Sequence, residues 1–124
     1  MNKKDRKKIN FLKLIPEKTI DYREEEEGKI TLILEKTKNP LLKSIINFFR
    51  KSQYFYIHLD KTGSFVWKQI DGKTDNHEIL KRMNDVLGDD KSYINRLRLF
   101  LRELEKSKFI KYKNIDDPEI LHDT

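Results

Sequence analysis

The chain of 124 residues has no cysteine, so disulfides, thiolate zinc sites, iron–sulfur clusters and cysteine nucleophiles are excluded. It also has no apolar run close to the roughly 20 residues that a membrane-spanning helix needs. The first residues, MNKKDRKKINF, lack the apolar stretch of a secretory signal. Because the length suits one modest core, these features predict a single cytoplasmic domain with no membrane span.

Signatures of catalysis are missing as well. The three histidines, His58, His77 and His122, are isolated from one another, and no His-x-x-x-His pair is present. The four glycines form no phosphate-binding loop, and the acidic runs EEEE and DD fall in apparent turns without a partner base. The sequence therefore predicts a protein that is not an enzyme and that uses no metal or cofactor.

Positive charge is concentrated at the N-terminus. The net charge is +6, yet residues 1–18 alone carry seven basic and two acidic side chains, which leaves the rest of the chain nearly neutral. We therefore expect a basic, flexible tail over residues 1–17. Such a tail is either a solvated, mobile end or a contact for phosphate, an anionic membrane or an acidic protein surface.

Alternating apolar residues predict three strands. DYR leads into the acidic turn EEEEGK and then into KITLILEK, which indicates two strands joined by a turn, and YFYIHL indicates a third. By the period of two, the apolar faces of the last two strands consist of Ile30, Leu32 and Leu34 and of Phe55, Ile57 and Leu59. The opposite face of the third strand consists of Tyr54, Tyr56 and His58.

A helical insert is predicted between the second and third strands. The segment NPLLKSIINFFRKSQ has apolar residues at helical spacing around polar ones, which favours an amphipathic helix over residues 40–52. Its apolar face either packs on the sheet of the same domain or seats on a membrane or a partner.

Three further helices follow the third strand, and each has aspartate, threonine, serine or glycine at its boundaries. The expected boundary residues are Asp60 or Thr62 and Gly72 for the first helix, Thr74 or Asp75 and Gly88 for the second, and about Asp90 and Ser107 for the third. Glu78, three residues after Asp75, completes a possible capping box.

Each of these helices has an apolar side. The first contains the only tryptophan, Trp67. The second has a stripe that consists of Ile79, Leu80, Met83, Val86 and Leu87. The third has a seam of Ile94, Leu97, Leu101 and Leu104, which Tyr93 and Phe100 widen, while Arg96, Arg98, Arg102 and Lys106 lie mainly outside it.

This order of elements predicts an α+β fold of winged helix-turn-helix type. An N-terminal three-stranded antiparallel sheet is followed by a three-helix bundle, with the helical insert before the third strand. The domain is expected to span residues 18–113, closed by a short extended piece over residues 109–112. Residues 114–124 are expected to form a C-terminal tail.

From Tyr56 to about Tyr112 the sequence resembles the PqqD-like family, also described as the recognition element for ribosomally made, post-translationally modified peptides. An Asp-Gly-x-Thr junction between two helices is the most specific part of the likeness. The matching residues are Ile57–Asp60, Gly63–Trp67, Ile70–Gly72 with Thr74, Glu78 with Ile79, and Phe100, Leu101 and Leu104 before Phe109 and Ile110. The insert over residues 40–52 lengthens a connection that is short in compact members of the family.

The resemblance implies a non-enzymatic peptide chaperone. Such a protein holds the leader of a precursor peptide in the groove between the third strand and the third helix. It presents the precursor to a modifying enzyme, often a radical S-adenosylmethionine enzyme. The expected peptide-binding residues are Tyr54, Tyr56, Ile57, His58 and Leu59 on the strand, and Tyr93, Arg96, Leu97, Phe100 and Leu101 on the helix.

Plainer roles stay open for several of these residues. Tyr93, Phe100 and Trp67 are also expected as ordinary core, because large aromatic side chains fill volume in a small domain. The amphipathic insert is an alternative cover for Tyr54, Tyr56 and His58.

DNA binding is the alternative function, because the third helix carries Arg96, Arg98 and Arg102 and the N-terminal tail is basic. Two features argue against nucleic acid. Glu103 and Glu105 interleave with the arginines, and only one short strand fits after the third helix, where a two-stranded wing usually grips the backbone.

Overall fold

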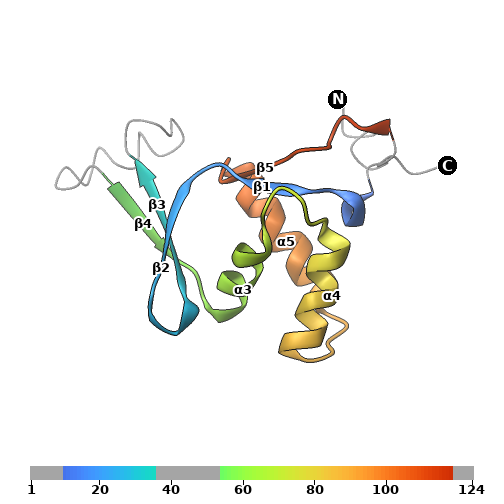
Figure 1. The fold of residues 1–124 in the computed structure, drawn as a ribbon, viewed down its shortest axis with the longest axis horizontal. Helices are drawn as coiled ribbons and strands as arrows, with labels where there is room; N and C mark the ends of the chain where they lie inside the picture. The colour runs from blue at the N-terminus through green and yellow to red at the C-terminus, as the bar shows by residue number, and fades with distance from the viewer. Residues whose placement is uncertain (1–9, 36–53, 119–124) are drawn as a thin grey trace. The chain divides into compact units, whose positions relative to one another are not determined.

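The computed structural model describes residues 10–35 and 54–118, and the helical insert predicted over residues 40–52 lies outside these ranges. The described residues form an α+β fold that includes a three-stranded antiparallel sheet and three α-helices (Figure 1). They divide into two compact units, one of residues 19–68 and the other of residues 10–18 and 69–118. Each unit is described by itself.

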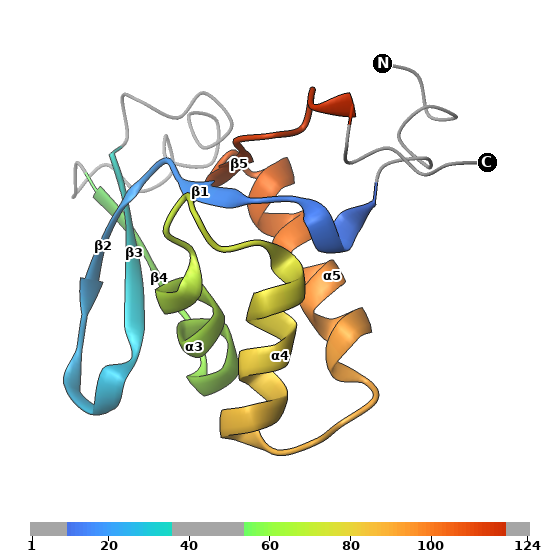
Figure 2. The same ribbon diagram turned by 45° about the vertical axis from the view of Figure 1, so that its right-hand side comes forward.

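The sheet of the first unit has the strand order β2-β3-β4 (Figure 2). Its strands are β2 (Asp21–Glu24), β3 (Ile30–Glu35) and β4 (Tyr54–His58), and both pairings are antiparallel. The acidic turn between β2 and β3 contains the 3-10 helix η2 (Glu26–Gly28), in which Glu27 and Gly28 have φ of 62° and 75°. The three strands that the alternation predicted are thus confirmed.

One face of this sheet is apolar and buried. Ile30, Leu32 and Leu34 are each no more than 2% exposed, as the period of two requires. Helix α3 (Lys61–Gln69) is tied to this face through Ser64, whose Oγ accepts from the Ile30 N–H at 2.8 Å and donates to the Leu59 carbonyl at 3.3 Å. The first predicted helix therefore exists and stabilises the buried face of the sheet.

The ends of β4 and α3 meet in a capped turn. The Asp60 carboxylate accepts from the Gly63 N–H at 2.7 Å, which selects Asp60 over Thr62 as the helix cap. Trp67 is fully buried, and the ring of Tyr22 contacts it edge to face at 5.7 Å. Trp67 is therefore core, as expected.

The second unit contains α4 (Asn76–Leu87) and α5 (Tyr93–Lys106). The buried side chains of these two helices, from the stripe and the seam that the sequence predicted, are Ile79, Met83, Leu97, Leu101 and Leu104. Two expectations were wrong in detail. Val86, expected in the apolar stripe of α4, is 66% exposed, because it lies in the last turn of that helix before an exposed loop. Helix α5, expected from about Asp90, begins at Tyr93. The Asp90 carboxylate instead accepts hydrogen bonds from the Ser92 N–H and hydroxyl in a turn.

A two-stranded antiparallel ribbon joins the two ends of the described chain. Strand β1 (Pro16–Lys18) pairs with β5 (Ile110–Tyr112), and the 3-10 helix η1 (Phe11–Lys13) precedes β1. The Asn114 side chain accepts from the Ile15 N–H at 2.8 Å and donates to the Lys13 carbonyl at 2.9 Å. The predicted tails were therefore wrong for residues 10–17 and for Asn114, because this pairing over a long sequence separation fixes both segments.

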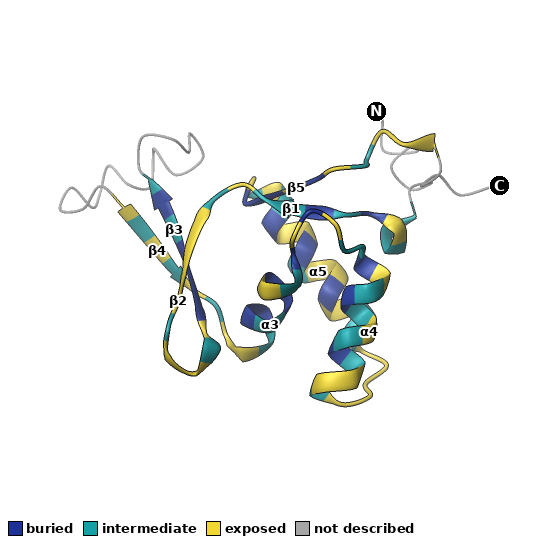
Figure 3. Ribbon diagram, viewed as in Figure 1, coloured by how far each residue is buried: buried dark blue, intermediate teal, exposed yellow. Residues whose placement is uncertain are grey.

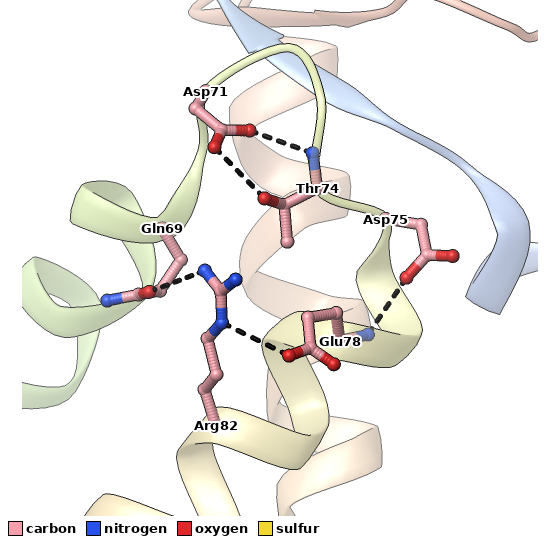
Figure 4. A network of polar contacts seen from close by, with 6 residues as sticks. All are labelled: Gln69, Asp71, Thr74, Asp75, Glu78 and Arg82. Atoms are coloured by element: carbon pink, nitrogen blue, oxygen red, sulfur yellow. Dashed lines mark hydrogen bonds and ion pairs between the residues drawn. The ribbon is translucent and has the colours of Figure 1, made fainter.

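The Asp-Gly-x-Thr junction between α3 and α4 is a hydrogen-bonded turn (Figure 4). The Asp71 carboxylate accepts from the N–H groups of Lys73 and Thr74, each at 2.8 Å, and from the Thr74 hydroxyl at 3.0 Å. Partial burial raises the pKa of the Asp71 carboxyl, but these hydrogen bonds outweigh it and hold that pKa below its usual value. Gly72 has φ of +76°, and its N–H donates to the Pro16 carbonyl.

The start of α4 adds a second set of polar contacts (Figure 4). Asp75 is the N-cap, and its carboxylate accepts from the Glu78 N–H at 2.9 Å. Arg82 contacts the Glu78 carboxylate at 3.4 Å and donates to the Gln69 side chain at 3.1 Å. These contacts link Gln69, the first residue of this segment of the unit, to the first turns of α4.

The end of α5 has the same left-handed geometry without glycine. The N–H of Phe109 donates to the Leu104 carbonyl and that of Lys108 to the Glu105 carbonyl, which together make a Schellman motif. Lys108 takes the position with φ of +64° that glycine usually fills.

We predict opposite effects of substitution at these two turns. Gly72→Ala should lower the free energy of unfolding by about 1–2 kcal/mol, because a side chain is strained at positive φ. Lys108→Gly should raise it by up to about 1 kcal/mol, because that strain is relieved. Urea unfolding measures both. Gly72→Asn is the control and should cost less than Gly72→Ala, since asparagine tolerates this conformation; an equal loss would contradict the account.

Candidate functional site

The two outer strands of the three-stranded sheet differ in charge. Strand β2 is exposed along its whole length and carries Asp21, Arg23 and Glu24 (Figure 3). Charged side chains of this kind oppose pairing with a further strand. Strand β4, with the sequence YFYIH, has no aspartate, glutamate, lysine or arginine. Among the described residues, β4 therefore provides the sheet edge that is better suited to accept another strand.

The register between β3 and β4 determines which backbone groups this edge presents. Leu59 donates its N–H to the Ile30 carbonyl at 2.9 Å, and the same ladder pairs Ile57 with Leu32. In an antiparallel pair, alternate residues direct their N–H and C=O groups to opposite sides. Phe55 and Ile57 thus face β3 like Leu59, and the backbone groups of Tyr56 and His58 face the outer edge.

The side chains of β4 alternate as the sequence predicted. Tyr54, Tyr56 and His58 are exposed, with both tyrosines 45% exposed, whereas Phe55 and Ile57 are half-buried on the face toward α3. Tyr56 and His58 therefore combine an outward backbone with a side chain on the open face of the sheet. Leu59, also an expected contact, is half-buried just after the strand.

A polar network crosses the open face and reaches His58. Thr31 Oγ1 lies 2.9 Å from His58 Nδ1, and Thr31 is only 1% exposed. On β2, Arg23 Nε lies 2.7 Å from the Glu25 carboxylate, and the Arg23 guanidinium lies 5.7 Å from the centre of the Tyr56 ring. The network therefore connects all three strands.

Charge and hydrogen bonding in this network favour an ionised Glu25. The hydrogen bond from Arg23 is the largest influence that holds the pKa of the Glu25 carboxyl below its usual value. Desolvation of the carboxyl acts in the opposite direction but is outweighed, and the positive charge of Arg23 adds to the lowering.

The sequence did not identify Arg23, Glu25 and Thr31 as site residues. Arg23 pairs with Thr31 and Thr31 with His58, so Arg23, Thr31 and His58 form one row across three strands. The period of two placed Thr31 and His58 on open faces, but only the strand register puts them together.

The expected helix-side residues all lie on α5, which belongs to the other unit. Leu97 and Leu101 are buried, Phe100 and Tyr93 are half-buried, and Arg96 is exposed. The Arg96 guanidinium lies 5.6 Å from the centre of the Tyr93 ring. A contribution of these residues to peptide binding stays a prediction.

Residues 10–35 and 54–118 contain neither a metal-binding cluster nor a membrane-spanning helix. No group of three or more histidine or acidic side chains there is arranged to hold a metal ion. No helix of this part of the chain is long and apolar enough to cross a membrane.

We predict that Glu25 makes stability depend on pH. A carboxyl whose pKa is lowered by folding stabilises the folded state above its usual pKa, and this contribution is lost as the pH falls through the lowered value. Glu25→Gln should therefore flatten the fall in stability below about pH 5. Urea unfolding across this range measures it, with Glu26→Gln as the control for charge in the same turn. Identical pH profiles for the two variants would refute the network.

Comparison with known proteins was made for the whole chain. The family model described as "Coenzyme PQQ synthesis protein D (PqqD)" matches residues 49–110, which is half of the chain. No curated protein and no solved structure matches. The matched range includes β4, the capped turn at Asp60, the Asp-Gly-x-Thr junction and both α4 and α5. The chain belongs to the PqqD family, the family of recognition elements for ribosomally made, modified peptides.

Proposed function

We propose that this protein is a non-catalytic chaperone that captures the leader of a ribosomally synthesised precursor peptide. The leader adds to β4 as a further strand, and the chaperone presents the precursor to a modifying enzyme, possibly of the radical S-adenosylmethionine type. The observation that carries the proposal is the uncharged outer edge of β4, where the backbone groups of Tyr56 and His58 point outward, in a member of the PqqD family. Family membership is consistent with a binding role without catalysis.

Strand addition draws on backbone and side chains together. The N–H and C=O groups of Tyr56 and His58 offer four hydrogen bonds, each with a net value of about 0.5–1.5 kcal/mol. Micromolar affinity requires roughly 8 kcal/mol. Side-chain contacts must therefore supply a large share of the binding energy, and these contacts also provide selectivity for one leader.

The modifying enzyme supplies the chemistry in this proposal. Family membership implies a partner in peptide modification. The role that follows for this chain is to hold the leader in an extended form, which lowers the entropic cost of presenting the attached core to the enzyme.

DNA binding has weaker support. Arg96, Arg98 and Arg102 are exposed on α5, as a recognition helix would require. However, Arg96 lies over Tyr93 and Arg98 lies 5.2 Å from the centre of the Phe11 ring. The strand after α5 pairs with β1 near the other end of the chain. Within the described residues it thus forms no hairpin that resembles a wing.

The main prediction concerns backbone hydrogen bonds. Short overlapping peptides from the reading frames beside the gene are screened against the full chain, and the tightest binder is then N-methylated at one residue at a time. Because only alternate residues of an added strand direct their N–H toward β4, affinity should fall roughly tenfold at every second position. Fluorescence anisotropy measures the affinity. Equal sensitivity at consecutive positions, or no binder among these peptides, would count against strand addition.

Salt dependence separates the two candidate functions. We predict that affinity for the bound peptide changes little between low and moderate salt, because backbone hydrogen bonds release few counterions. Duplex DNA bound through about six or more phosphate contacts should instead weaken about a thousandfold or more over that range. Tight DNA binding with this steep dependence, together with no peptide binding, would favour the regulator.

A further inference from the structure

Tyr56 combines a backbone at the outer edge of β4 with a side chain on the open face of the sheet, opposite α3. An added antiparallel strand would continue an antiparallel sheet, and antiparallel pairs are slightly more stable per residue than parallel ones. In such a pair, the residue directly opposite Tyr56 exchanges both backbone hydrogen bonds with it. Its side chain lies on the same open face, with the two Cβ atoms about 4.5–5.5 Å apart.

The Tyr56 ring is exposed toward solvent and is contacted by a cation from the far strand of the sheet. The residue is 45% exposed, although Ile33 on β3 is its neighbour in the register. The Arg23 guanidinium reaches across β3 from β2 and lies 5.7 Å from the centre of the ring. A cation over an aromatic ring at an exposed site contributes about 0.5–1 kcal/mol. Arg23 therefore holds the ring, and the exposed part of the ring is available to a residue of the added strand.

The charges near the ring favour neither an acidic nor a basic residue opposite Tyr56. Arg23 Nε lies 2.7 Å from the Glu25 carboxylate, so these two charges largely cancel. A carboxylate would also meet Asp21, which lies in the same row of the sheet, and a cation would meet the guanidinium that already lies over the ring. An aromatic residue instead gains about 0.5–1.5 kcal/mol beyond the area that it buries, when the two ring centres are 4.5–7 Å apart.

We propose that Tyr56 is a specificity-determining residue that selects an aromatic leader residue directly opposite it, on the open face of the sheet. This inference rests on the proposed strand addition to β4. The selected residue makes both backbone hydrogen bonds and a ring contact, so backbone and side-chain recognition coincide at one leader position. The leader residues on either side of it point to the other face, where Phe55 and Ile57 are half-buried. Arg23 acts as a positioning residue, because it contacts the Tyr56 ring.

The contact between Arg23 and Tyr56 is testable without any peptide. In NMR spectra of the full chain, side-chain protons of Arg23 should be shifted upfield by the ring current. The shift should vanish in Tyr56→Val and in Tyr56→Thr, which remove the ring but keep a residue that favours strands, and it should persist in Tyr56→Phe. Unchanged Arg23 resonances in a ring-free variant would overturn the positioning role. Amide spectra confirm which variants retain the sheet.

Selectivity is tested with the peptide that binds the full chain most tightly. Each peptide position is made phenylalanine or leucine in turn, and fluorescence anisotropy gives the dissociation constants. At one position that is sensitive to N-methylation, phenylalanine should bind about two- to tenfold tighter than leucine. Tyr56→Val should abolish this preference and Tyr56→Phe should keep it. Arg23→Gln should weaken it, and Arg23→Lys, which restores a cation, should recover it.

The two proposals fail in different ways. If the peptide shows the alternating N-methyl pattern but the phenylalanine-to-leucine ratios are the same for the wild type and Tyr56→Val, the role of Tyr56 is overturned and strand addition stands. The role of Tyr56 also falls if the ratio changes only at positions insensitive to N-methylation, because those side chains point to the other face. If N-methylation shows no alternation, strand addition itself is wrong and the role of Tyr56 falls with it.

Discussion

The hydrogen-bond register between β3 and β4 is the constraint on which the proposed function of this sheet depends. A shift by one residue would turn the tyrosines and His58 of β4 into the buried face and would direct the backbone groups of Phe55 and Ile57 outward. The bond from the Leu59 N–H to the Ile30 carbonyl, next to the Asp60 cap of α3, opposes such a shift. The fold therefore specifies both the atoms and the side chains that this edge presents.

Among the described residues, the two edge strands of the sheet, β2 and β4, differ in how well they can pair with a further strand. Charges on β2 discourage a further strand, while β4 carries aromatic side chains that suit cross-strand contacts. An edge of this kind is an aggregation hazard unless a partner uses it. The proposed peptide-binding role gives this feature a physical reason.

Sequence periodicity was sufficient to predict the buried residues of an element wherever one of its faces packs in the core. Ile30, Leu32 and Leu34 on β3 and Leu97, Leu101 and Leu104 on α5 follow directly from the periods of strand and helix. Strand β1 was missed, because a three-residue segment with Pro16 has no detectable period and its partner strand is distant in sequence. Val86 was misplaced, because periodicity does not indicate where a helix extends beyond its neighbours.

The candidate site was predictable only in part, because some of its residues are brought together only by the pairing of strands. Alternation and the resemblance to the family predicted Tyr56 and His58 as peptide contacts, and the structure places both side chains on the exposed face of β4. Arg23, Glu25 and Thr31 depend on the pairing of three strands, and the register of β2 against β3 has no signature in any single segment. The polar row that orients His58 is thus a property of the folded sheet.

Amide hydrogen exchange with and without bound peptide tests the central claim most directly. Before binding, the amides of Phe55 and Ile57 should already be protected by β3, while those of Tyr56 and His58 exchange faster. If a peptide adds to β4, the Tyr56 and His58 amides should become slow and the other two should change little. Protection elsewhere, with Tyr56 and His58 still exchanging freely in the saturated complex, would contradict the account.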